Sequence, residues 1–155
     1  MPTSPVNIIT SYMAHLETVC KTQTVLLPAE VQSDKFHVEL ALLPHPLLPG
    51  NGAIRLRLRA TACAEIAATE AALNECLAHS IRLSLFFDQA ESFAVRSTQT
   101  QAVPTDGQPL YAMAYHTAIR EDDELFTDLT ERDGQYSYRE SWLVELEVRQ
   151  CALAF

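Results

Sequence analysis

The end of the chain carries the pattern that most restricts its fold. Between Gly134 and Cys151, apolar side chains recur at every second position, and those of one parity are Trp142, Val144, Leu146 and Val148. Alternate residues of a strand share one face of the sheet, so this period of two predicts a strand with one buried face. The stretch Ile54–Ala60 has the same alternation and predicts a second strand of this kind.

The polar faces of these two predicted strands carry opposite charges. Arg55, Arg57 and Arg59 alternate with apolar residues in the first strand, and Glu145 and Glu147 do so in the last. If the strands pair, arginines would lie across from glutamates, and each well-placed pair would contribute about 0.2–1 kcal/mol. We take these five residues as candidates for a subunit interface. A solvated strand face paired with glutamates, a channel lining and, least favoured, a nucleic-acid groove are the alternatives.

Two segments have the spacing of amphipathic helices. Apolar residues recur three and four positions apart from Val6 to Cys20, with Ser4 as a potential cap and Pro5 at the first helical position. The same period returns from Thr69 to Ser80, and Thr69 or a nearby residue is expected to begin this second helix.

Shorter patterns complete the expected order. Alternation predicts strands at 36–42, 81–87 and 110–119, and an edge strand or loop near Pro28. Loops are expected at about 44–52, 88–109 and 120–134, with room for a brief strand at Phe93 and Val95. Asp133-Gly134 predicts a turn before the final strand.

This order predicts an α+β fold in a single domain over residues 1–155: an antiparallel (mixed) β-sheet with two α-helices packed on one face. A chain of 155 residues is long enough to bury one continuous core. Its 48% hydrophobic and 20% charged residues are typical of globular proteins and argue against a wholly disordered chain.

The net charge and the spacing of the cysteines limit which partners and which cellular compartment we expect for this protein. A net charge of −9 disfavours nonspecific contact with nucleic acid or an anionic membrane. No signal-peptide pattern or membrane-spanning stretch is recognised, and the four cysteines occur singly, without zinc-ligand spacing. We therefore expect a protein of the reducing cytoplasm, with reduced thiols, no metal site and no membrane partner.

No pattern of catalytic residues or cofactor ligands is found. The chain lacks a glycine-rich phosphate loop and a nucleophile elbow. An enzyme would require His37, His116 and an acid to converge. Asp122, Asp123 and Glu124 favour a solvated acidic loop, with a docking surface for a basic partner or an ion site as alternatives.

A second candidate contact lies in the proline-rich link between Pro44 and Gly52. Leu47 and Leu48 make this link too apolar for a purely solvated loop, so they are expected to lie against the body of the protein or a neighbour. Together with Asp122, Asp123 and Glu124, these leucines are our candidates for partner-docking loops.

The order of elements resembles that of a known protein family. An N-terminal helix, a strand pair with a long loop, a helix after Ile54–Cys63 and a closing hairpin ending in Tyr136-Ser-Tyr-Arg-Glu-Ser-Trp142 are similar to the tail terminator and tail-completion (minor tail) proteins of long-tailed bacteriophages. The resemblance covers about Val6 to Val148.

The resemblance implies a structural, non-enzymatic protein without a cofactor. Such a protein would form a homo-oligomeric, usually hexameric ring that caps the tail tube and meets the head connector. It would act in the host bacterial cytoplasm and be incorporated into the virion tail. Tail-tube and head-connector proteins would be its partners. A small acidic partner-binding or chaperone-like module that forms a dimer is the alternative.

Overall fold

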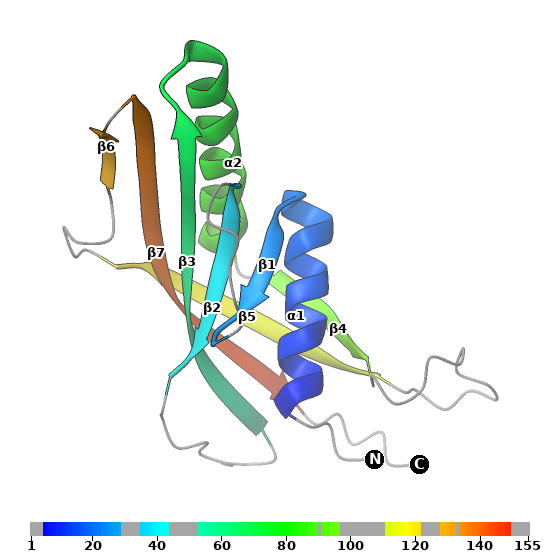
Figure 1. Ribbon diagram of the computed structural model, residues 1–155. Coiled ribbons are helices and arrows are strands. Elements are labelled where there is room, and N and C mark those ends of the chain that lie inside the picture. Colours follow the sequence, from blue (N-terminus) through cyan, green and yellow to red (C-terminus); the bar gives the residue numbers. More distant parts are fainter. Residues whose placement is uncertain are drawn as a thin grey trace.

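The computed structural model describes residues 5–28, 35–43, 53–89, 91–96, 111–121, 128–132 and 134–149. Within these residues, seven strands form one mixed sheet, and two helices pack on one of its faces (Figure 1). In chain order the elements are α1 (Pro5–Cys20), β1 (Gln23–Leu26), β2 (His37–Leu42), β3 (Ala53–Ala67), α2 (Glu70–Asp88), β4 (Glu91–Arg96), β5 (Tyr111–Arg120), β6 (Asp128–Arg132) and β7 (Gln135–Arg149).

The centre of the sheet is the antiparallel pair of its two longest strands. β3 and β7 are each 15 residues long and pair along their whole lengths, from Ala53 opposite Arg149 to Ala67 opposite Gln135. Leu56, Leu58 and Ala60 of β3 are buried, as are the alternating apolar residues of β7. The two strands predicted from their period of two are therefore neighbours, and β3 is longer than the predicted segment.

The strand order is β1-β2-β3-β7-β5-β4, with β6 beside the first part of β7. Only the β1–β2 pair is parallel among the described pairs. One edge of β7 pairs with β3. The other edge pairs first with β6, up to Arg139, and then with β5, from Trp142 onward. The changeover lies at Glu140 and Ser141.

Helix α1 lies in the hollow of the curled sheet. Ile8, Tyr12, Leu16 and Cys20, four residues apart, are all buried, as the predicted amphipathic pattern requires. The helix packs against both β1 and β4, which are the two ends of the strand order, and against α2. The sheet therefore wraps around α1 (Figure 1). The predicted Ser4 cap lies outside the described residues.

Helix α2 is longer than predicted and absorbs a predicted strand. It begins after Thr69, whose hydroxyl accepts a hydrogen bond from the Ala72 amide. It continues to Asp88, so the strand predicted at 81–87 is wrong. The buried residues Cys76, Leu83, Phe86 and Phe87 follow the helical period, and Phe87 stacks on Trp142 with ring centroids 4.6 Å apart. Ile81 and Leu85, which suggested alternation, are exposed.

Two segments predicted as loops contain strands. β4 occupies 91–96 and buries Phe93 and Val95, the brief strand considered from the sequence. β6 occupies 128–132 within the predicted 120–134 loop and pairs with β7 around Gly134, whose φ of +76° suits a residue without a Cβ. These strands extend the sheet without changing the predicted class. The α+β fold with both helices on one face is confirmed.

Candidate functional site

The outer face of the sheet, opposite the helices, holds the predicted charged residues in a ladder. Arg55 lies directly across from Glu147, and Arg57 lies across from Glu145. The Nε–Oε2 distances are 3.7 Å and 3.3 Å, respectively. The arginines are exposed and the glutamates half-buried, so solvent screens these pairs and each contributes less than about 1 kcal/mol.

Arg59 completes the ladder with a partner that was not predicted. Its register neighbour is Leu143, but its Nε donates to Oε1 of Glu121 at 2.7 Å, just beyond the end of β5. One step further, the hydroxyls of Thr61 and Ser141 are 2.9 Å apart and buried. The three arginines thus have acidic partners within their own chain, and a neighbouring subunit at this face would meet a ladder of paired charges.

The other predicted contact residues cannot be placed on this surface. Leu47, Leu48, Asp122, Asp123 and Glu124 lie outside the described residues, so their role as docking loops stays a prediction.

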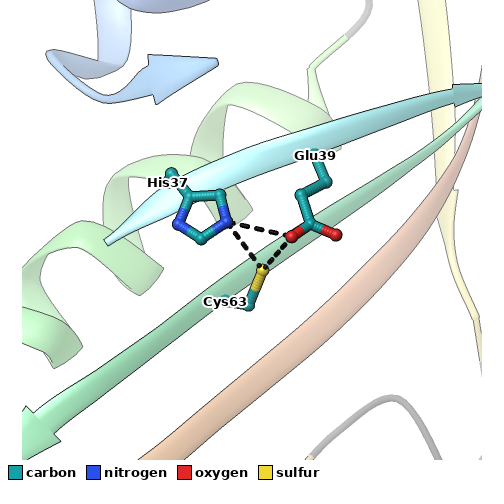
Figure 2. A group of neighbouring side chains, drawn as sticks. All are labelled: His37, Glu39 and Cys63. Carbon is teal, nitrogen blue, oxygen red and sulfur yellow. Dashed lines mark hydrogen bonds and ion pairs between the residues drawn. The ribbon is translucent and has the colours of Figure 1, made fainter. Parts of the chain in front are cut away.

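A polar cluster occupies the outer face of β2 and β3. His37 and Glu39 are alternate residues of β2, and Cys63 of β3 is the cross-strand partner of His37 (Figure 2). His37 Nε2 lies 3.0 Å from Glu39 Oε2, and Cys63 Sγ lies 3.3 Å from each of these atoms. His37 is buried, whereas Glu39 and Cys63 are half-buried. We call these three residues the β2–β3 cluster.

The cluster favours a carboxylate beside a protonated thiol. Burial opposes ionisation of Glu39, but its contacts with His37 and Cys63 and the charge of Arg139 more than offset this effect and lower the Glu39 pKa. Burial, together with the Glu39 charge and hydrogen bond, raises the pKa of the Cys63 thiol to about 12. Without a change at the site, Cys63 is therefore a poor nucleophile near neutral pH.

His116 is far from this cluster in the architecture. It lies on the inner face of β5, completely buried, and its Nε2–H donates to the carbonyls of Gln89 and Phe86 at the end of α2. His37 lies on the outer face of β2, a strand that does not neighbour β5. The convergence of His37, His116 and an acid that an enzyme would require is not found.

Exposed apolar side chains lie on two opposite sides of the molecule. On α2, Leu77, Ile81 and Leu85 succeed one another by four residues and form an α2 stripe that points away from the buried side of the helix. On the outer face of β5, Tyr115 and Ile119 are exposed on either side of Thr117, and we call these two residues the β5 patch. Ile81 is 61% exposed and Ile119 is 69% exposed. The helices cover the inner face of the sheet, so the stripe and the patch face opposite directions.

Sequence reasoning missed both the β2–β3 cluster and the α2 stripe. His37 and Cys63 are 26 positions apart, and only the β2–β3 register brings them together. The available signal was that His37 and Glu39 are two positions apart in a predicted strand, which places them on the same face. For the stripe, the four-residue spacing of Leu77, Ile81 and Leu85 was the signal that a helix period continued.

Among the described segments, neither helix has the combined length and apolar character needed to cross a bilayer. No protein-family model matches the sequence, and no curated protein matches it.

Proposed function

We propose that this protein is a structural subunit of a bacteriophage or prophage tail, which closes into a homo-oligomeric ring, caps the tail tube and joins it to the head connector. The observation that carries the proposal is the pair of exposed apolar surfaces on opposite sides of the domain. These are the α2 stripe and the β5 patch.

The α2 stripe has the character of a contact surface. Burying an isoleucine or leucine side chain contributes about 1.5–3 kcal/mol, so covering Leu77, Ile81 and Leu85 would give several kcal/mol toward association. Single exposed apolar residues are common on protein surfaces, but three of them spaced by four residues lie in a row along one face of the helix.

The placement of the two surfaces favours a ring. A head-to-tail interface joins two different surfaces of the same chain, and repetition closes a ring when the rotation between subunits permits. The α2 stripe of one subunit and the β5 patch of the next are two such surfaces. The charge ladder runs beside the β5 patch, since Tyr115 and Thr117 are the register partners of Glu147 and Glu145. The ladder would then set the orientation at the rim of the contact.

The resemblance to tail terminator proteins supplies the biological setting. That resemblance rests on a helix, a strand pair with a long loop, a second helix and a closing hairpin, and the structure adds β1 before the strand pair and β4 after the second helix. In this proposal no residue of the protein has a catalytic role. The proposed partners of the ring are the tail-tube and head-connector proteins.

A dimeric partner-binding module is the second candidate, favoured by the same α2 stripe. Residues spaced by four along a helix suit a symmetric helix–helix contact, in which the stripe packs against its own copy. In this arrangement the β5 patch stays exposed.

The native mass of the purified protein separates these proposals. Native mass spectrometry and light scattering in moderate salt should give a closed species of about six subunits, and negative-stain imaging should show a ring. A discrete dimer at all concentrations would support the partner-binding module instead. A monomer at the highest concentration reached would contradict self-assembly through these surfaces.

A further inference from the structure

We propose that His37 Nε2, Glu39 Oε2 and Cys63 Sγ form a zinc-binding site with three protein ligands and one position open to water. The site lies on the outer face of β2 and β3 and is independent of the ring proposal. Its three donor atoms come from two adjacent strands and meet at one point (Figure 2).

With a neutral His37 imidazole, the cluster has one hydrogen atom too few for its acceptors. His37 Nδ1 lies 2.7 Å from the Lys35 carbonyl oxygen, which can only accept, so the Nδ1–H donates to it. In a neutral imidazole, Nε2 then carries a lone pair and faces Glu39 Oε2, another acceptor, at 3.0 Å. The Cys63 thiol has one proton for these two acceptors. A positive centre among the three atoms, either a second proton on His37 or a metal ion, removes the conflict.

The Lys35 carbonyl also prepares His37 as a ligand. Metal-binding histidines almost always donate the hydrogen of their other ring nitrogen to a carbonyl or carboxylate, which fixes the tautomer and the orientation of the ring. Here that bond is made by a residue two positions earlier in the same chain. Cys63 lies directly across from His37 in the pairing of β2 with β3. The strand pairing therefore holds Cys63 beside the imidazole, and Glu39 follows on the same face of β2.

The spacing of the donor atoms fits a tetrahedral ion. Zinc bonds of about 2.0–2.3 Å at the tetrahedral angle place ligand atoms about 3.3–3.6 Å apart. The three separations here are 3.0 Å, 3.3 Å and 3.3 Å. An expansion of a few tenths of an ångström, within the reach of side-chain rotation, would admit the ion.

The chemistry of the donor set selects the metal. A thiolate with an imidazole suits zinc, and one carboxylate completes a common three-ligand set, whereas magnesium and calcium prefer oxygen ligands. Binding replaces the thiol proton, which leaves to solvent. Arg139, the register partner of Cys63 on β7, favours the ionised forms of Cys63 and Glu39 from the other side.

Cobalt(II) titration of the metal-free full-length protein tests the site. Cobalt is a spectroscopic substitute for zinc, and a bound tetrahedral ion with a thiolate ligand gives visible d–d bands and a sulfur-to-cobalt charge-transfer band in the near ultraviolet. We expect one equivalent to give this spectrum and zinc to displace it. Cys63→Ser should abolish the charge-transfer band, and Glu39→Gln should weaken binding at least about tenfold.

Two control variants distinguish this site from general metal binding. Cys76→Ser removes a thiol outside the cluster, and Glu145→Gln removes a carboxylate on the same sheet face. Both should keep the cobalt spectrum and the zinc-dependent rise in melting temperature, which Cys63→Ser should lose. Absence of the charge-transfer band in the unmodified protein, or a spectrum unchanged by Cys63→Ser, would overturn the proposal.

Discussion

Arg120 and Glu140 form an ion pair in which the carboxylate is almost completely buried beneath α2, while the arginine side chain remains 45% exposed. Ser80 and Tyr138 also donate hydrogen bonds to Glu140, and Arg120 reaches Ser84. This network joins α2 to β5 and β7 at the point where β7 changes partners.

Removal of Arg120 should therefore destabilise the fold more than removal of a ladder arginine. Arg120→Ala leaves a buried carboxylate without its cation, and we expect a loss of about 3 kcal/mol in the free energy of unfolding at neutral pH. Arg57→Ala breaks an exposed pair and should cost less than about 1 kcal/mol. Urea unfolding of both variants measures the difference, and equal losses would show that the buried network contributes nothing special.

The two faces of the second half of α2 should respond differently to truncation. Phe87 is buried against Trp142, so Phe87→Ala should cost about 3–5 kcal/mol. Leu85→Ala changes an exposed side chain on the same helix and should stay within about 0.5 kcal/mol in the free energy of unfolding. Were 81–87 a strand of period two, Leu85 and Phe87 would share a face and the two losses would be similar.

The sequence predicted the elements whose buried face can be recognised from the spacing of apolar residues within that element alone. The alternation in β3 and β7 and the four-residue spacing in α1 needed no partner to be recognised. The strand predicted at 81–87 was wrong because Ile81 and Leu85, which are exposed, were interpreted as buried residues of a strand. The β2–β3 cluster could not be predicted, because it depends on the register that places Cys63 opposite His37. The in-chain pairing of Arg59 with Glu121 likewise needs the end of β5 to lie near β3.

The α2 stripe should control self-association. Ile81→Asp with Leu85→Asp introduces two charges into the proposed contact, where their desolvation is unfavourable, so the native mass should fall to that of the monomer. Val6→Asp is the matched control, because Val6 on α1 is as exposed as Ile81, at 61%. Retention of the oligomer by the double variant, with helicity unchanged by circular dichroism, would exclude the stripe as the interface.

The charge ladder should affect assembly more than folding. Changing Arg55, Arg57 and Arg59 together to Ser removes the arginine partners of Glu147, Glu145 and Glu121, and we expect the ring to weaken. The Arg55 and Arg57 pairs are screened by solvent and should contribute little to the stability of the monomer. Most of the loss should come from Arg59, because the Glu121 side chain is only 9% exposed, and we expect a total loss of a few kcal/mol. The Arg57→Glu, Glu145→Arg swap keeps a pair within the chain and serves as a control. An unchanged native mass in the triple variant would remove these residues from the interface.

Stability should fall in mildly acidic solution because His116 is buried as a neutral imidazole. Burial lowers its pKa below the ordinary 6.5, although the Gln89 and Phe86 carbonyls and Glu91 partly counteract this, while His15 adds to the lowering. Above about pH 6.5 neither the folded nor the unfolded chain protonates this residue. As pH falls below that value the unfolded chain binds the proton first, so stability is lost toward the folded-state pKa, at up to about 1.4 kcal/mol per pH unit.

Unfolding free energies at about pH 7.5 and about pH 5.5 measure this loss, and His116→Gln should reduce the difference. His79 acts in the same direction, since burial and Arg82 lower its pKa despite Glu75. His79→Gln is therefore the companion variant. His79 is only half-buried, so we expect it to flatten the pH dependence less than His116→Gln does. A pH dependence that is the same in the unmodified protein and in His116→Gln would mean that other groups cause it.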